Sequence, residues 1–279
     1  MKKSAIRLLN YTGERLKSDK GRLVFLLIYI AYTVFSSVYF AVLGRTRDAL
    51  LPLGYASLFV VLLFAFECFL RIECPLPFVL VLFFVPIGGI LGSCYDFYTF
   101  IPFFDSVLHT VSGFIFAALG YVIMERILMK NDTRSRLAML IFAFAFSLAV
   151  AVLWEMFEWA LTAAMSGDMH EDSLVNSIHS YLLSGSHSGT VDITDIEGTI
   201  IIYDGGKQYY INGGYMDLGL FDTLLDMLVC LIGACAFLLL GTAQLLLGKK
   251  ILTPLTPRCL GMKEEHVRHS RSEDGKRSL

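Results

Sequence analysis

Six long apolar runs limit what this chain can fold into. They cover residues 23–43, 50–70, 75–94, 105–128, 137–163 and 220–247. Each is close to the ~20 residues that an α-helix needs to cross the hydrocarbon of a bilayer. With 56% hydrophobic residues and a mean hydropathy of +0.63, the 279-residue chain is too apolar for an ordinary soluble domain. The fold class predicted is therefore an all-α, polytopic transmembrane helix bundle.

The distribution of Lys and Arg predicts the orientation of these spans. With the N-terminus inside, the cytoplasmic segments are 1–22, 71–74, 125–136 and 248–279, which hold 20 of the 23 Lys and Arg residues. This asymmetry follows the positive-inside rule. We therefore expect a multi-pass protein of the cell (inner) membrane with both termini in the cytoplasm. The first run is too long for a signal-peptide core, which indicates an uncleaved anchor.

The segments that flank the spans differ in character. Residues 1–22 form a basic N-terminal segment, interpreted as a topology signal, with attraction to anionic lipid as the alternative. Spans one to five occupy 23–163, and the sixth span occupies 220–247. The basic tail 248–279 is polar and poor in aromatic residues, so it is predicted to be disordered.

An acidic segment, residues 164–219, separates the fifth and sixth spans. It carries eight Asp and Glu residues against the single basic residue Lys207. Within it, the stretch GTIIIYDGGKQYYING predicts a small β-hairpin with a glycine-containing turn. The predicted orientation makes this hairpin insertion extracytoplasmic. It is either a tolerated loop insertion or a lid over a site below it.

Three spans each carry two ionisable residues at helical spacing. The pairs are Asp105 and His109, Glu155 and Glu158, and Asp222 and Asp226. Residues three or four positions apart share a helix face, so the members of each pair point the same way. In the predicted orientation all three pairs fall at a similar depth near the outer leaflet. We therefore expect the six side chains to meet in one polar site.

Five carboxylates and one imidazole cannot all be charged together in hydrocarbon. A charge in the membrane costs at least ~2.5 kcal/mol, and like charges also repel one another. Bound cations, protonation or a water-filled cavity would each relieve this cost. A carboxylate-rich set with one imidazole suits Mg²⁺, Mn²⁺, Ca²⁺ or Fe²⁺, with Zn²⁺ less favoured. The expected ligands are His109, Glu155, Glu158, Asp222 and Asp226.

The fourth span supplies the expected catalytic pair, Asp105 and His109. Asp105 would orient His109 or act as a base. A bound ion could activate a water or hold a phosphate or carbonyl oxygen of a substrate. Simpler alternatives also exist, since Asp105 and Asp222 lie where Asp favours a helix N-terminus. A lone interior histidine is more often hydrogen-bonded than metal-bound.

Two tryptophans and one further acid are weaker candidates for substrate contact. Trp154 and Trp159, the only two tryptophans, flank the glutamates and are typical of membrane-interface anchors, with substrate contact as the alternative. Asp96 lies in an outer connection and could add another polar group.

Other reactive residues rank lower. Glu67, Glu73 and Glu125 lie near inner ends and are expected to snorkel or to be solvated. The loop histidines match no ligand motif by spacing, and they are His170, His179 and His187. The six cysteines show no metal or redox spacing, so no disulfide framework is expected.

The ordered polar motifs resemble those of a known family. They are D-x3-H-x3-G from Asp105, W-E-x2-E-W over 154–159, and D-x3-D-M from Asp222, followed by Gly233. In this order they resemble the YjdF-like uncharacterised bacterial inner-membrane proteins. They are more distantly similar to the VanZ-like membrane proteins linked to glycopeptide resistance. The resemblance covers roughly residues 80–245 and implies a compact helical membrane fold in the cell envelope. The long acidic hairpin departs from that pattern.

Three classes of function are compatible with these features. The leading hypothesis is a membrane enzyme that performs metal-assisted hydrolysis or transfer on a lipid or lipid-linked envelope substrate. The alternatives are a proton- or cation-coupled transporter and a non-catalytic membrane sensor or assembly protein. Membrane lipids and a lipid-linked or small-molecule substrate are the expected partners, and nucleic acid is not.

Overall fold

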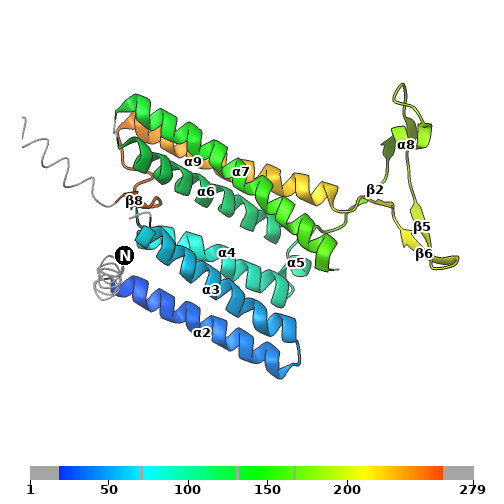
Figure 1. Ribbon diagram of the computed structural model, residues 1–279, viewed down its shortest axis with the longest axis horizontal. Coiled ribbons are helices and arrows are strands. Elements are labelled where there is room, and N and C mark those ends of the chain that lie inside the picture. Colours follow the sequence, from blue (N-terminus) through cyan, green and yellow to red (C-terminus); the bar gives the residue numbers. More distant parts are fainter. Residues whose placement is uncertain (1–18, 70–71, 130–131, 166–167, 260–279) are drawn as a thin grey trace, which may run out of the picture. The chain divides into compact units, whose positions relative to one another are not determined.

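The computed structural model describes residues 19–69, 72–129, 132–165 and 168–259 (Figure 1). Most of the predicted basic N-terminal segment and most of the predicted disordered tail therefore lie outside the described residues. The chain divides into two compact units. The first comprises Met1–Val150 with Val229–Leu279, and the second comprises Ala151–Leu228.

Six described helices are long and apolar enough to cross a membrane. They are α2 (Lys20–Val42), α3 (Thr46–Phe69), α4 (Leu76–Cys94), α6 (Phe104–Leu128), α7 (Thr133–Met165) and α9 (Leu220–Leu247). The predicted polytopic helical fold is confirmed. Helices α3 and α7 begin about one turn before the predicted apolar runs. Their first turns are polar, so hydrophobicity alone did not include them. At α7, Asp132 accepts hydrogen bonds from the backbone N–H and hydroxyl of Ser135, which caps the helix.

The helices of the first unit pack as antiparallel neighbours. Helix α2 packs on α3, α3 on α4, and α4 on α6 (Figure 1), as short connections require. The ring of Phe83 lies at the centre of this packing and meets Phe25 and Tyr29 edge-on at centroid distances of 5.6 and 4.8 Å. Strand β1 (Ile72–Glu73) pairs antiparallel with β8 (Arg258–Cys259) and ties the α3–α4 connection to the segment after α9.

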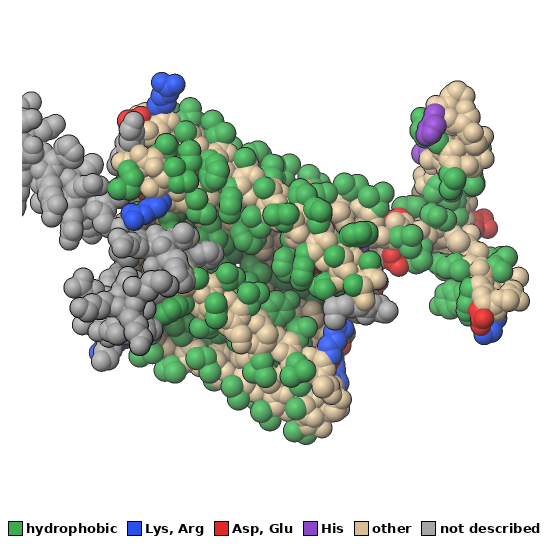
Figure 2. All heavy atoms as spheres, viewed as in Figure 1, with side chains coloured by type: hydrophobic (Ala, Val, Ile, Leu, Met, Phe, Trp, Pro, Cys, Tyr) green, Lys and Arg blue, Asp and Glu red, His purple; other side chains and the backbone are tan. Residues whose placement is uncertain are grey.

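Much of the outer helix surface is apolar. On α2, the side chains of Leu27, Ile28 and Phe35 are 57%, 63% and 63% exposed. Figure 2 shows hydrophobic side chains over the visible faces of the helices, with Lys and Arg side chains near helix ends. Such a surface is stable against acyl chains and costly against water. None of the cysteines whose side chains are described forms a disulfide, and these are Cys74, Cys94, Cys230, Cys235 and Cys259.

Helices α6 and α9 approach closely through glycines. A Cβ at Gly113 would lie 2.1 Å from the carbonyl oxygen of Cys230, and one at Gly233 would lie 2.0 Å from that of Thr110. The hydroxyl of Ser147 on α7 donates a 2.7 Å hydrogen bond to the Gly113 carbonyl. Small residues and interhelical hydrogen bonds replace the hydrophobic effect as the source of helix association in lipid.

Glu67 corrects a sequence prediction, because it neither snorkels nor is solvated. Its side chain is 2% exposed and accepts two hydrogen bonds from the Arg22 guanidinium, with N–O distances of 2.6 and 2.8 Å. The backbone N–H of Cys74 adds a third, longer bond at 3.4 Å. A planar guanidinium matches both carboxylate oxygens. The two side chains therefore make with each other the hydrogen bonds that they would otherwise make with water. This ion pair joins the start of α2 to the end of α3.

The second unit contains the end of α7, a set of short strands and the start of α9. The strands pair antiparallel, β2 (Leu174–Val175) with β7 (Tyr215–Met216), β3 (Ile178–Ser180) with β4 (Val191–Ile193), and β5 (Gly198–Tyr203) with β6 (Lys207–Asn212). A single turn of helix, α8 (Tyr181–Ser184), follows β3. The predicted hairpin is confirmed as β5–β6, with Asp204, Gly205 and Gly206 at positive φ in its turn. Its extracytoplasmic location stays a prediction.

The glycine contacts of α6 and α9 predict a specific loss of stability. In Gly113→Ala and Gly233→Ala, the new methyl group must push the two backbones apart, which should cost about 1–3 kcal/mol. Thermal unfolding of the purified protein in detergent measures the effect. Gly54→Ala on α3 is the matched control, because a Cβ there meets nothing within 4 Å. Equal unfolding temperatures for all three variants would contradict the close contact.

The buried Arg22–Glu67 pair predicts a non-additive double-mutant cycle. Glu67→Leu or Arg22→Met leaves a buried charge without its partner, and each change should destabilise the protein by about 3–5 kcal/mol. The double variant Arg22→Met/Glu67→Leu removes both charges and should recover most of this loss. Detergent unfolding of the four proteins measures the coupling. Additive effects of the two single changes would show that the side chains do not interact.

Candidate functional site

Two glutamates near the end of α7 share a buried helix face. The side chains of Glu155 and Glu158 are only 5% and 8% exposed, although they lie in an apolar membrane-spanning helix. Their spacing of three residues places them on the same side of α7. The intervening and flanking residues face outward, as Met156 and Trp159 show with exposures of 60% and 64%. The polar face of α7 is therefore turned into the protein.

His170 joins the two glutamates, although it lies beyond the end of α7. Its side chain is 8% exposed, and its Nε2 lies 3.2 Å from the backbone carbonyl oxygen of Glu155. A carbonyl oxygen only accepts, so in this contact Nε2 carries the proton and Nδ1 of a neutral ring keeps its lone pair. One ligand atom from each of Glu155, Glu158 and His170 lies within 4.8 Å of the others. These three residues form the α7 cluster.

His170 reaches the glutamates because the residues that follow it are hydrogen-bonded to the residues around the start of α9. The backbone N–H of Glu171 donates to Oδ2 of Asp222 at 3.0 Å, and that of Ser173 donates to Oδ1 of Asp217 at 2.9 Å. Strand pairing of β2 with β7 continues the same connection. Gly219 has φ +78° and lies so close to His170 that a Cβ would be 2.3 Å from the histidine Cβ. Glycine is therefore required there both for the backbone conformation and for space.

Asp217 organises the start of α9. Its carboxylate accepts backbone hydrogen bonds from Ser173, Gly219 and Phe221. Desolvation alone would raise the pKa of Asp217, but the backbone N–H donors outweigh it and hold this pKa below its ordinary value. The carboxylate also lies at a helix N-terminus, where negative charge is favourable.

A pocket of about 430 Å³ opens beside the α7 cluster. It is lined by Trp159, Thr162, Ala163, Asp168, His170, Asp172 and Leu218. His170 belongs both to the pocket wall and to the α7 cluster, so it connects the buried carboxylates with an open space. Desolvation, together with the charges of Asp168 and Asp217, raises the pKa of Asp172.

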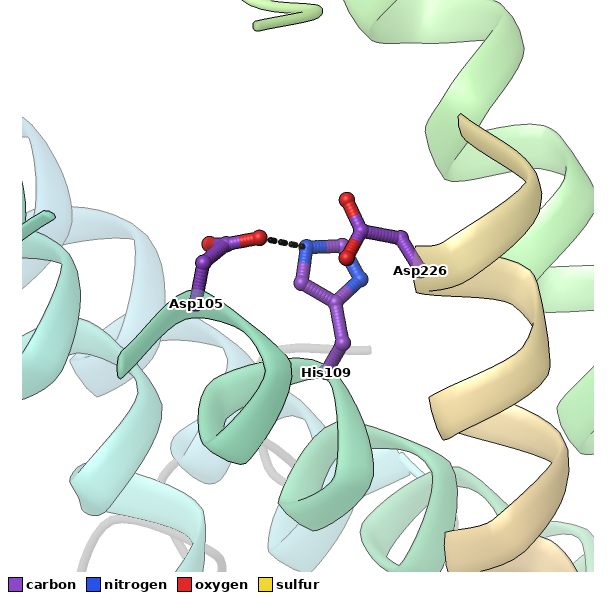
Figure 3. Close-up of side chains that lie close together, drawn as sticks. All are labelled: Asp105, His109 and Asp226. Atoms are coloured by element: carbon purple, nitrogen blue, oxygen red, sulfur yellow. Dashed lines mark ion pairs between the residues drawn. The ribbon is translucent and has the colours of Figure 1, made fainter. Parts of the chain in front are cut away.

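The predicted pair on α6 lies in the first unit. Nε2 of His109 lies 3.5 Å from Oδ2 of Asp105, one helical turn earlier, and Figure 3 shows this contact as a dashed line. On the other side of the ring, Nδ1 lies 3.8 Å from Sγ of Cys230, which donates to the His109 carbonyl oxygen at 3.2 Å. The ring of His109 therefore lies between an acid on its own helix and a thiol on α9.

The remaining predicted residues occupy varied environments. Asp222 is half-buried and holds the Glu171 backbone, and Asp226 is 2% exposed. Trp159 lines the pocket, whereas Trp154 is 41% exposed and is not among its lining residues. Asp96 is exposed at φ 61° before the short helix α5 (Phe97–Phe100). That all six ionisable residues meet in one site stays a prediction.

Sequence reasoning missed His170. Its position, twelve residues after Glu158 and beyond the helix, matches no ligand spacing. Only the fold-back of the chain toward Asp217 and Gly219 brings the ring to the glutamates. The other two histidines of the acidic segment have separate contacts, since His179 binds Asp192 at 2.7 Å and His187 packs against Tyr181.

These features define the class of the chain as a polytopic helical membrane protein with short strands between its last two long helices. Within that class, residues 22–246 match the family described as "Predicted membrane protein (DUF2238)", and the chain belongs to that family. No curated protein and no solved structure was found to match it. The resemblance to YjdF-like and VanZ-like proteins stays a prediction.

The hydrogen bonds of Asp217 predict acid-sensitive anchoring of the segment that carries His170. Because its pKa is lowered in the folded protein, the carboxylate contributes stability above its ordinary pKa of about 4. That contribution is lost as the pH falls through the lower folded value. In Asp217→Asn, amide hydrogen exchange at Ser173 should be faster at neutral pH by roughly tenfold, and the difference from wild type should shrink in acid. Asp204→Asn in the hairpin turn is the control. A difference that persists unchanged in acid would contradict a role for the charge.

Proposed function

We propose that this protein is an integral membrane enzyme that binds a divalent metal ion at Glu155, Glu158 and His170. It uses the ion for hydrolysis or group transfer on a lipid or lipid-linked envelope substrate. The observation that carries the proposal is the α7 cluster itself, in which three buried side chains of ligand type converge within 4.8 Å beside a pocket.

Electrostatics supports a bound cation. Two unit negative charges 4 Å apart repel by about 4 kcal/mol even at an effective dielectric constant of about 20. Burial in an apolar segment adds the cost of desolvating each carboxylate. A divalent cation between Glu155 and Glu158 would offset both costs and would use the imidazole as a third donor.

The orientation of His170 also supports ligation. Metal-binding histidines usually donate their second ring N–H to a carboxylate or a backbone carbonyl, which fixes the ring and its tautomer. The Nε2 contact with the Glu155 carbonyl has this form and leaves Nδ1 as the donor atom. Three protein donors leave further coordination positions for water and substrate, as catalytic metal sites require.

The donor set limits both the ion and the chemistry. Two carboxylates and one imidazole suit Mg²⁺, Mn²⁺, Ca²⁺ or Fe²⁺. Such an ion supplies Lewis acidity toward a phosphoryl or carbonyl oxygen, or lowers the pKa of a bound water. In this proposal Asp222 has a positioning role, because its carboxylate holds the backbone next to His170.

Asp105 and His109 are proposed to act as an acid–base pair, because Nε2 of His109 lies 3.5 Å from the Asp105 carboxylate on the same face of α6. We further propose an inner-membrane location with both termini in the cytoplasm, supported by the Lys and Arg asymmetry.

Elemental analysis of the purified protein tests the metal site. The wild-type protein should carry a stoichiometric divalent ion after gel filtration. In Glu158→Gln and His170→Ala, metal affinity should fall at least about tenfold, because a ligand is lost. His179→Ala is the matched control, since this histidine belongs to the same acidic segment and is bound to Asp192 instead.

Two results would contradict the proposal. One is wild-type protein without a divalent ion that also fails to bind Mg²⁺, Mn²⁺, Ca²⁺ or Fe²⁺ on titration. The other is an ion retained in both ligand variants. Circular dichroism of each variant separates loss of the ion from loss of the fold.

A further inference from the structure

The pocket beside the α7 cluster lies where a membrane span gives way to the acidic segment. Trp159, Thr162 and Ala163 come from the last turns of α7, whose membrane-spanning part ends at Ala164. The opposite wall comes from residues beyond that span. Asp168 precedes His170 in the sequence, and Asp172 follows it. A molecule in this pocket therefore contacts both an interfacial helix end and an extramembrane loop.

The lining of the pocket selects for positive charge. It combines an exposed indole with two carboxylates, and no Lys or Arg is among its lining residues. The indole face attracts cations through its quadrupole, and tryptophan is the strongest of the aromatic side chains in this respect. The surrounding segment 168–219 reinforces the selection, because it carries eight acidic residues against Lys207.

The size of the pocket and its buried wall indicate a ligand site. Its volume of about 430 Å³ falls within the range of small-molecule sites, roughly 300–1,000 Å³. His170, which is more than nine-tenths buried, contributes to the wall while its Nε2 contacts the Glu155 carbonyl. The pocket therefore borders the proposed metal ligands through one ordered side chain.

We propose that this pocket binds the ammonium group of a zwitterionic lipid headgroup, such as choline or ethanolamine, between Trp159 and the carboxylates of Asp168 and Asp172. The role of the bound lipid as a substrate rests on the proposed function. In that case the phosphate next to the ammonium group would lie toward the α7 cluster. The interfacial position of the pocket favours a lipid headgroup over a free amine. The substrate class is thus a phospholipid with a cationic headgroup, and anionic headgroups are excluded by the acidic wall.

The two tryptophans make the pocket directly observable. In a Trp154→Phe background, Trp159 is the only tryptophan and reports on the pocket by fluorescence. Titration of the full-length protein in a maltoside detergent with choline should give a saturable change in emission. The neutral isostere 3,3-dimethylbutan-1-ol should bind at least tenfold more weakly, because it lacks the charge. In the reciprocal background Trp159→Phe, the emission of Trp154 should not respond to choline.

Charge variants test the two carboxylates. Asp168→Asn and Asp172→Asn should each weaken choline binding at least fivefold, and the double variant should weaken it further. Glu171→Gln is the matched control, because this acid lies between the two aspartates but is not among the pocket-lining residues. Equal binding of choline and its neutral isostere, or wild-type affinity in the double variant, would overturn the proposal.

Two further experiments distinguish a lipid headgroup from a free amine, and choline binding from metal binding. Dihexanoyl phosphatidylcholine should bind more tightly than choline, and dihexanoyl phosphatidylglycerol should not compete. Choline bound more tightly than the short-chain lipid would overturn the lipid assignment. Choline binding by a wild-type protein that carries no divalent ion and binds none on titration would leave this pocket standing and reject the proposed function. A stoichiometric metal without choline binding would do the reverse.

Discussion

Hydrocarbon offers a backbone amide no hydrogen-bond partner, so every span of this chain must satisfy its own backbone groups as a helix. The same constraint acts on polar side chains, which must find partners inside the protein. Arg22 and Glu67 do so as a bidentate pair between α2 and α3. Glu155 and Glu158 do so on the inner face of α7, next to a histidine. Each of these two groups of buried ionisable side chains therefore brings together residues that are distant in the sequence.

Association of the helices in lipid depends on close contact instead of on hydrophobic burial. Gly113 and Gly233 let the backbones of α6 and α9 touch, and Ser147 adds a hydrogen bond to the carbonyl of Gly113. This contact also places Cys230 against His109. The packing that stabilises the first unit thus also fixes the position of one of its ionisable residues.

The acidic segment of the second unit combines an anchored base with an extended hairpin. Asp217, Asp222 and the β2–β7 pairing fasten the residues around His170, while β5–β6 projects beyond them. The contacts that fasten the base of the segment therefore lie where it borders the α7 cluster and the pocket. Such a distribution suits a loop whose first residues complete a site.

The amino-acid pattern by itself determined the six spans, the β5–β6 hairpin and the shared face of Glu155 and Glu158. These features depend on local periodicity, hydrophobicity and turn residues, which act over a few neighbouring positions. The place of His170 beside the glutamates and the pairing of Glu67 with Arg22 were decided only by the tertiary structure. Both join residues across loops or between helices, and their geometry follows from the packing of glycines and from loop hydrogen bonds that no local spacing encodes.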